Sequence, residues 1–161
     1  KDPGFRAASP MAKVPALDDG GIRVADSAAI CLYLADRYGE GRFSPAVDSP
    51  DRGPFLFWMC FVPGTVEPAM AEKAGHWTPN RTAHGWGDFD SMISTWEAGL
   101  GDKPWILGDH FSAADVMLGS SAVFLRMFGM LPPSAVLNDY ADRCLERSAY
   151  RKALALEQDE T

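Results

Sequence analysis

Two short apolar runs near the start of the chain, followed by long stretches of helical periodicity, set the hydrophobic pattern of this sequence. The runs are Val14–Leu17 and Ile22–Val24, and the turn residues Asp19-Gly20 between them are typical of a β-hairpin. Pro15 follows a β-branched residue and lacks an N–H donor, so the chain is expected to turn out of the strand there, a cis peptide bond being one form of that turn. The pattern predicts a two-stranded hairpin with an open backbone edge at Val14.

Apolar residues at helical spacing dominate the rest of the chain. The first helix is expected directly after the hairpin, with Asp26 or Ser27 as its N-cap and Gly39 as its end. A helical turn at residues 5–8 is expected before the hairpin. The later segments predict helices over residues 51–73 with a kink at Pro63-Gly64, over 79–100, over 112–128, after Pro132-Pro133-Ser134, and from Ser148, with residues 157–161 as a frayed acidic tail.

A stretch rich in Gly, Ser and Pro divides this pattern into two parts. We therefore predict a fold between α+β and mostly α. A hairpin and a helix occupy residues 1–39, a linker covers 40–50, and an all-helical unit covers 51–161. A chain of 161 residues is long enough to bury roughly 70% of its unfolded surface.

Charge and composition exclude several functions. The net charge of −7 argues against a nucleic-acid partner, because such binding needs clustered Lys and Arg. No apolar run approaches the roughly 20 residues of a membrane span, and the polar start of the chain at Lys1–Gly4 is unlike a signal peptide. No membrane association is expected.

The cysteines and histidines do not have the spacing of a metal or redox site. No Cys-x-x-Cys pair occurs, and the histidines share no ligand spacing, so we expect no metal. The cysteines are expected in helices as small core residues, which fits a reducing, cytoplasmic environment. The residues concerned are Cys31, Cys60, Cys144, His76, His84 and His110.

A second motif lies in the later part of the chain, where the sequence reads Gly-Asp-His-Phe-Ser-Ala-Ala-Asp-Val over residues 108–116. Ser112 and Asp115 have the spacing of a capping box, in which each residue satisfies a backbone N–H of the other. The motif predicts a structural role, since it marks the start of a largely buried helix.

The first motif resembles the glutathione-binding half of the glutathione S-transferase family. Residues 9–17 read Ser-Pro-Met-Ala-Lys-Val-Pro-Ala-Leu, and residues 25–30 read Ala-Asp-Ser-Ala-Ala-Ile. The family usually shows Asn-Pro-x-Gly-Lys-Val-Pro-x-Leu followed by Glu-Ser-x-Ala-Ile. This chain departs at Ser9, Ala12 and Asp26, and we expect the first two to lie in a surface turn with mild effect. The Ser112 motif is similar to the core helix of the family's all-helical C-terminal domain.

The resemblance implies a role for each residue of the first motif. The backbone of Val14 would pair with the cysteinyl part of glutathione, with Pro15 holding the edge open. Asp26 would bind the amino group of the γ-glutamyl end, and Ser27 its carboxylate. Plain strand-end and N-cap roles are the alternatives. Lys13 would either meet the glycyl carboxylate or stay a solvated surface charge.

The resemblance begins inside the family's thioredoxin-like N-terminal domain. It implies that the first strand, first helix and second strand of that domain are not represented, and that roughly 40–50 residues precede this sequence, an amount that completes a domain of common size. In the family, the Tyr, Ser or Cys that activates the thiol of glutathione follows that first strand. We therefore assign no catalytic residue.

The expected function is a glutathione transferase, with glutathione as co-substrate and a small hydrophobic electrophile as second substrate. The resemblance also implies a homodimer. A non-catalytic binding or scaffold protein is the alternative, and a glutathione-dependent isomerase or disulfide reductase a third. Trp58 and Phe61 either line the electrophile pocket or belong to the core. The segment with Trp77 and Trp86 either covers that pocket or forms a surface loop.

Overall fold

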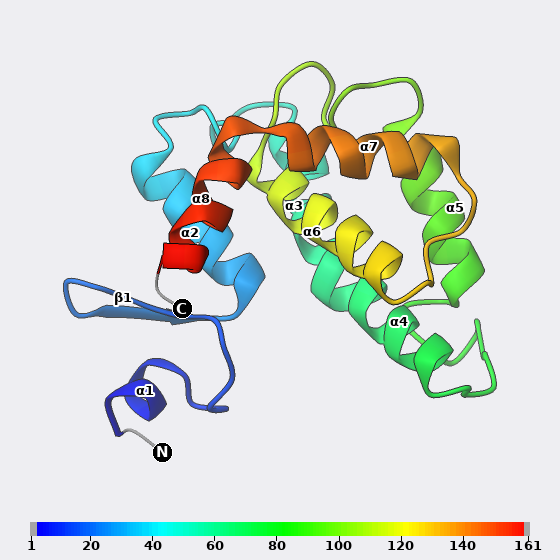
Figure 1. Cartoon of the computed structure of the whole chain (residues 1–161), viewed down its shortest axis with the longest axis horizontal. Helices are drawn as coiled ribbons and strands as arrows, with labels where there is room; N and C mark the ends of the chain where they lie inside the picture. Colours follow the sequence, from blue (N-terminus) through cyan, green and yellow to red (C-terminus); the bar gives the residue numbers. More distant parts are fainter. Residues whose placement is uncertain (1–2, 160–161) are drawn as a thin grey trace.

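A computed structural model of the chain describes residues 3–159, with side chains for residues 3–156. The short helix α1 (Pro3–Ala8) contacts an antiparallel pair of strands, β1 (Ala16–Asp19) and β2 (Ile22–Ala25), and helix α2 (Ser27–Tyr38) follows the second strand. Figure 1 shows this hairpin projecting from one side of a larger helical unit. The predicted hairpin is confirmed, although β1 begins and ends two residues later than expected.

The hairpin is closed by two glycines. Asp19 pairs with Ile22 across the turn, and Gly20 and Gly21 between them have φ angles of 60° and 93°. Positive φ at both turn positions is the geometry that matches the twist of the two strands, and glycine adopts it without steric cost. The turn thus fixes the register, which places Ala16 opposite Ala25 at the other end.

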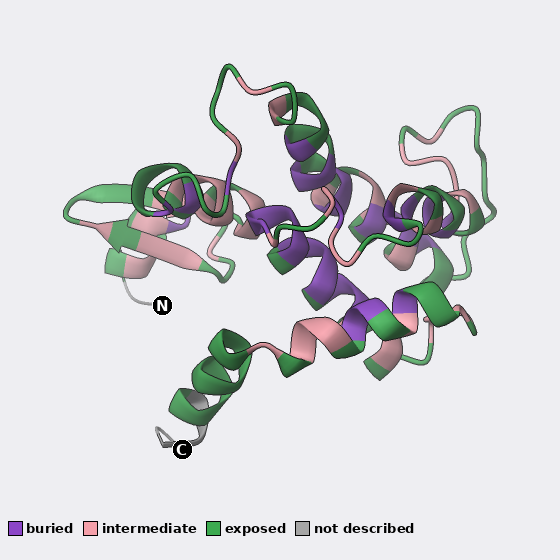
Figure 2. Ribbon diagram, turned by 90° about the horizontal axis from the view of Figure 1, so that it is seen from above, coloured by how far each residue is buried: buried purple, intermediate pink, exposed green. Residues whose placement is uncertain are grey.

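The helical unit surrounds one central helix, α6 (Ala113–Met127), which has more buried residues than any other described helix. Figure 2 shows buried positions gathered along the helices at the centre of the molecule, with the hairpin and the last helix mostly exposed or intermediate. The other elements are α3 (Arg52–Phe61), the π-helix η1 (Val62–Val66), α4 (Glu67–Ala74), α5 (Phe89–Leu100), α7 (Ala135–Glu146) and α8 (Ser148–Asp159).

The long helix predicted over residues 51–73 is interrupted rather than kinked. It consists of α3, η1 and α4, and the π-helical segment contains Pro63 and Gly64. Proline removes a helical hydrogen bond, and a π-helical turn accommodates the extra residue without ending the helix. The buried residues nevertheless continue at helical spacing through the π-helix, from Met59 in α3 through Val62 and Val66 to Ala69 in α4.

The helix predicted over residues 79–100 starts about ten residues too early, because α5 begins only at Phe89. Its N-cap is Asp88, whose carboxylate accepts from Ser91 N at 2.8 Å, and Gly87 before it has a φ of 75°. The segment between α4 and α5 is instead held by the buried carboxylate of Glu72, which lies 2.8 Å from Nδ1 of His84.

The prediction of a frayed tail is also wrong for residues 157–159, which are helical. Residues 160–161 lie outside the described residues.

The capping box at the start of α6 is confirmed and belongs to a larger network. Asp115 is only 1% exposed, and its carboxylate accepts from Ser112 N at 2.9 Å and from Ser112 Oγ at 3.1 Å. It also accepts from Ile106 N and from the Tyr140 hydroxyl, both at 2.8 Å. Burial raises the pKa of Asp115 against the lowering effect of these hydrogen bonds. One carboxylate therefore ties α6 to α7 and to the preceding loop.

An ion pair connects α2, the helix that follows the hairpin, to the helical unit. Arg52, at the start of α3, forms two hydrogen bonds of 2.9 Å to the two carboxylate oxygens of Asp36 in α2. The same carboxylate accepts from Ser44 Oγ at 2.7 Å, and Arg52 also donates to the Pro45 carbonyl. The segment between α2 and α3 is thus fixed at both ends, and the division of the chain at residues 40–50 stays a prediction.

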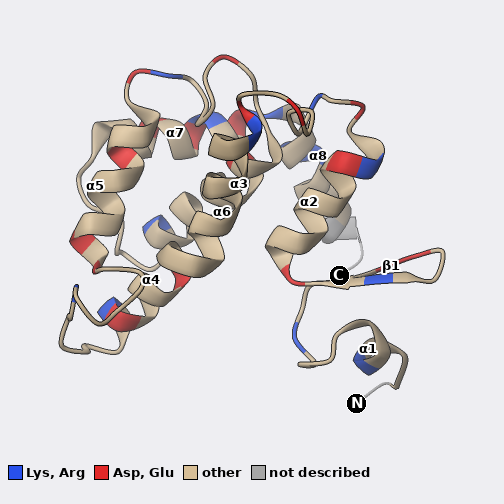
Figure 3. Ribbon diagram, turned by 180° about the vertical axis from the view of Figure 1, so that it is seen from behind, with Lys and Arg blue, Asp and Glu red and all other residues tan. Residues whose placement is uncertain are grey.

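Figure 3 shows that charged residues of both signs are distributed over the loops and helices along the chain. No described helix is long and apolar enough to span a membrane.

Removing the Asp115 carboxylate should destabilise the fold severely. Asp115→Ala leaves two backbone N–H groups and the Tyr140 hydroxyl buried without acceptors, so we expect a loss of about 3–5 kcal/mol in the free energy of unfolding. Asp109→Ala, on an exposed carboxylate of the same loop, should change it by no more than about 0.5 kcal/mol. Urea unfolding measures both, and equal losses in the two variants would contradict the network.

The Asp36–Arg52 pair should make stability depend on pH. Hydrogen bonds from Arg52 and then Ser44 lower the pKa of Asp36 below 3.8, so the stabilisation is present above about pH 4 and is lost as the pH falls through the lowered pKa. Because the Asp36 side chain is 43% exposed, solvent screening limits the loss in Asp36→Asn to about 0.5–1 kcal/mol at pH 7. Urea unfolding of both proteins should show that difference at pH 7 and a smaller one at pH 3; an undiminished difference at pH 3 argues against the ion pair.

Candidate functional site

The end of the hairpin brings four of the predicted residues together. Ala16 lies opposite Ala25 in the ladder, so Pro15 directly before it and Asp26 directly after Ala25 flank the same end of the sheet. Val14 and Ser27 come one step further on each side. The Val14–Pro15 peptide bond is cis. The register thus places the start of β1 and the start of α2 at the same end of the hairpin.

Val14 offers an open backbone edge. Its side chain is 82% exposed, and its N–H and C=O make no hydrogen bond to any other described residue. Unpaired backbone groups at a sheet edge are a ready template for an added extended peptide. The predicted role of Val14 needs such an edge.

Asp26 both caps α2 and keeps one carboxylate oxygen available. Its Oδ1 accepts from Ala28 N at 2.9 Å and from Ala29 N at 3.3 Å, while Oδ2 has no partner among the described residues. The residue has a φ of 81° and a ψ of 133°, a combination outside the left-handed helical region that few residues with a Cβ adopt. Asp26 can therefore cap α2 with Oδ1 while Oδ2 stays available for a ligand.

The start of α2 presents groups for both charges of an amino acid. Ser27 is the first helical residue, and its N–H lies among those that a helix leaves unpaired at its positive end, where a carboxylate is favoured. Burial and the charge of Asp26 raise the pKa of Glu67, which places the first residue of α4 near Asp26. An ammonium group is favoured on that side of the site. Glu67 was not predicted from the sequence; the nearest signal was the helix-breaking Pro63-Gly64 pair before it.

The loop before the site is closed by Ser9, which is 2% exposed rather than part of a surface turn as predicted. Its hydroxyl donates to the Lys13 carbonyl at 2.7 Å and accepts from Lys13 N at 3.0 Å. Serine can do so because a hydroxyl both donates and accepts. The buried hydroxyl thereby holds the residue before Val14 in place, while the side chain of Lys13 is exposed.

Ala12 is under more strain than the sequence suggested. It has a φ of 53°, in the left-handed region that costs an L-residue with a Cβ about 1–2 kcal/mol. The resembling family places glycine at this position. Alanine in place of the family's glycine therefore strains the backbone, contrary to the mild effect that was expected.

The two aromatic candidates for an electrophile pocket lie in the interior. Trp58 is 7% exposed and Phe61 is 5% exposed, and their rings meet edge to face with centroids 5.0 Å apart. Trp58 packs so closely on Gly99 of α5 that a Cβ there would lie 2.2 Å from the indole. These positions fit the alternative of core residues, and the pocket role stays a prediction.

The cysteines differ from one another in environment. Cys60 is exposed on α3, contrary to the expected core position, whereas Cys31 and Cys144 are partly buried and all three are free. Burial is the main cause of the raised pKa of Cys31, with the Asp26 charge adding to it. A thiol in that state is a poor source of thiolate at neutral pH.

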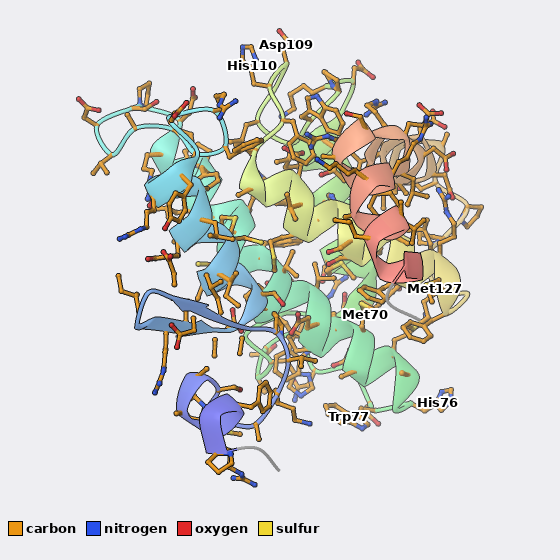
Figure 4. The ribbon with its side chains drawn as sticks, turned by 60° about the vertical axis from the view of Figure 1, so that its left-hand side comes forward. Met70, His76, Trp77, Asp109, His110 and Met127 are labelled. Carbon is orange, nitrogen blue, oxygen red and sulfur yellow. The ribbon has the colours of Figure 1, made fainter. Side chains whose placement is uncertain are left out.

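Metal-binding groups are not assembled in the described part of the chain, where no three His, Cys, Asp or Glu side chains have a suitable arrangement. Figure 4 shows His76 beside the end of α4 and His110 at the opposite end of the molecule. Trp77, labelled in the same view, is 55% exposed on the loop after α4.

Comparison with known proteins gives consistent matches along the chain. A family model described as "Glutathione S-transferase, N-terminal domain" matches residues 1–42, and one described as "Glutathione S-transferase, C-terminal domain" matches residues 79–143. Glutathione S-transferase hmp2 of Hypomyces subiculosus is 29% identical over 133 residues, which cover 74% of this chain and 63% of that protein. The chain thus spans less than two thirds of this relative.

Solved structures show the same fold. The bacterial glutathione S-transferase BphK, solved as a ternary complex, superposes with a TM-score of 0.80 at 22% identity, covering 96% of this chain and 78% of that one. A sphingomonad glutathione S-transferase solved with glutathione superposes with a TM-score of 0.73 at 25% identity, with the same coverage. The predicted fold class, a partial thioredoxin-like unit followed by an all-helical unit, is confirmed.

The strain at Ala12 can be measured. Ala12→Gly should raise the free energy of unfolding by about 0.5–1 kcal/mol, because the relieved strain exceeds the entropy that glycine adds to the unfolded chain. Ala29→Gly, at an exposed position inside α2, should lower it by about 0.5–1 kcal/mol. Urea unfolding that finds both substitutions destabilising would contradict the strained conformation.

Proposed function

The chain belongs to the glutathione S-transferase family, and from this premise we propose that it binds glutathione where the hairpin ends and α2 begins. The observation that carries the proposal is the exposed, unpaired backbone of Val14, together with the free Asp26 Oδ2 and the first N–H of α2 at the same end of the hairpin. Glutathione is a peptide with a charged amino-acid end, so it needs both features at once.

Each residue has a distinct task in this proposal. The Val14 backbone pairs with the cysteinyl part, and Pro15 adds no donor that would compete for it. The free Oδ2 of Asp26 binds the γ-glutamyl ammonium, with Glu67 strengthening the negative potential. Ser27 binds the γ-glutamyl carboxylate through its hydroxyl and its N–H. Lys13 meets the glycyl carboxylate from its exposed position.

The proposed reaction is transfer of the glutathione thiolate to a small hydrophobic electrophile. In such a reaction, sulfur forms a bond to the electrophilic carbon while the leaving group departs with its electron pair. A donated hydrogen bond that lowers the pKa of the thiol would favour the reactive thiolate. We assign that donor to none of the described residues, because the Cys31 thiol has a raised pKa and the Tyr33 hydroxyl is bonded to Asp19.

The same observation keeps a second candidate open, a glutathione-binding protein without transferase activity. Reduction, isomerisation and conjugation would all use the site described above, and they differ in the residue that activates the thiol. We further propose a cytoplasmic location, which fits the three free cysteines.

A homodimer is also proposed, and α3 offers a surface for it. Phe57 is 52% exposed and Leu56 is 38% exposed. Cys60 lies one turn from Leu56 on the same outer side and is exposed as well. Apolar side chains grouped on one helix face are typical of surfaces that are buried in an assembly.

The charge of Asp26 can be removed without losing the helix cap. Asn caps helices as well as Asp and has nearly the same shape, so Asp26→Asn should leave the melting temperature unchanged. Glutathione affinity should fall by about 1.5–3 kcal/mol, the range for a hydrogen bond to a charged group. Asp48→Asn, on an exposed acid in the linker, is the charge-matched control.

Calorimetric titration of the whole chain with glutathione measures this difference. Unchanged affinity in Asp26→Asn would remove the assignment, and equal weakening in Asp48→Asn would reduce it to a general charge effect. Turnover of chlorodinitrobenzene then separates the two candidates: glutathione binding with release of chloride supports the transferase, and binding without it supports the non-catalytic protein.

A further inference from the structure

Three side chains from the later part of α2 converge on one carboxylate at the turn end of the hairpin. Asp19, the last residue of β1, accepts at Oδ2 from the Tyr33 hydroxyl at 2.7 Å and from the Tyr38 hydroxyl at 2.6 Å. Nε of Arg37 lies 3.2 Å from the same oxygen, and its guanidinium carbon lies 5.7 Å and 5.4 Å from the ring centres of the two tyrosines. These side chains form the Asp19 cluster, which attaches the hairpin to α2.

The Asp19 cluster is charged at neutral pH. Hydrogen bonds from Tyr38 and then Tyr33 lower the pKa of Asp19, while burial, followed by the bond to Asp19, raises the pKa of Tyr33. The carboxylate is therefore ionised, and the Tyr33 hydroxyl keeps the proton that it donates. Hydrogen bonds to an ionised acceptor are roughly twice as strong as those between neutral groups. The charge of Asp19 is thus the part of the cluster on which the attachment depends.

The neighbouring acid, Asp18, makes its contacts within the hairpin instead. Alternate residues of a strand face opposite sides, and the Asp18 carboxylate accepts from Nε of Arg23 at 3.1 Å and from Gly21 N at 2.9 Å. Arg23 is its partner across the ladder. Asp18 therefore connects the two strands to each other, whereas Asp19 connects the hairpin to α2.

The cluster and the candidate glutathione site lie at opposite ends of the same elements. β1 runs from Ala16, beside the site, to Asp19 in the cluster, and α2 runs from Ser27 in the site to Tyr38. The hairpin projects from the helical unit (Figure 1), and among the described elements α1 and α2 are the helices that it mainly contacts. The chain connection at Asp26 and the Asp19 cluster thus hold the hairpin against α2 at two separate points.

We propose that Asp19 is a positioning residue for glutathione, which holds the Val14 edge and the start of α2 in the relative placement that the tripeptide needs. The inference rests on the proposed function, in which glutathione meets Val14 through its cysteinyl part and α2 through its γ-glutamyl end. A hairpin attached at one point only has to be ordered by the ligand, and that ordering reduces the affinity. Asp19 touches no ligand in this account and acts through Tyr33 and Tyr38.

Ligands of different length separate this role from a general loss of stability. Glutathione uses both sides of the site, whereas γ-glutamyl methylamide carries the γ-glutamyl end alone and uses only the start of α2. Asp19→Asn should weaken glutathione binding about five- to tenfold and leave the affinity for γ-glutamyl methylamide unchanged. Amide NMR titration of the whole chain measures both affinities, and circular dichroism establishes that the variant is folded.

Two further variants control for charge and for folding. Asp18→Asn removes the same charge from the neighbouring position and should leave both affinities unchanged. Tyr38→Phe removes one hydroxyl from a ring that is 52% exposed, so this variant should fold even where Asp19→Asn does not. It should weaken glutathione binding about two- to threefold, and it should add nothing to Asp19→Asn, because both substitutions break the same contact.

Equal glutathione affinity in the unmodified chain and in Asp19→Asn would overturn this inference and leave the proposed site intact. Equal weakening of the two ligands would also overturn it, because Asp19 would then be a purely structural residue. Failure of the unmodified chain to bind either ligand would contradict the proposed function and, with it, this inference.

Discussion

The candidate site depends on a single constraint: an unpaired strand edge has to lie beside the start of a helix. In this chain the hairpin register provides it, because the Ala16–Ala25 pair places the start of β1 next to the start of α2. The Gly20-Gly21 turn determines that register. A slip by one residue would move Val14 away from Ser27 and reverse the faces of both strands.

Two polar networks hold the surroundings of this site. The buried Ser9 hydroxyl closes the loop that leads to Val14, and the Asp36–Arg52 pair attaches α2 to the helical unit. Within that unit, Asp115 joins α6 and α7 through buried hydrogen bonds. The Ser9 and Asp115 networks satisfy groups that burial would otherwise leave unpaired, and the Asp36–Arg52 pair fixes α2, so the rigid scaffold and the open edge are parts of one arrangement.

Short-range sequence patterns predicted the elements whose ends are marked by capping or turn residues. The Asp26 cap, the hairpin turn and the Ser112–Asp115 box are all short-range patterns. The cap and the box occur where expected, and the turn lies one residue later, at Gly20-Gly21. The start of α5 was missed because Pro79-Asn80 resembles a helix start, while Asp88 and the distant Glu72–His84 contact decide the outcome. Such a contact between separate elements is not visible in a local pattern.

The strain at Ala12 and the contribution of Glu67 were missed for the same reason, since both follow from how separate segments meet. The central claim concerns atoms of the backbone, and amide NMR observes them directly. Titration of the ¹⁵N-labelled chain with glutathione should shift the Val14 and Ser27 amide signals most, in a saturable manner. No saturable shifts, or the largest shifts in a distant element such as α5, would contradict the account.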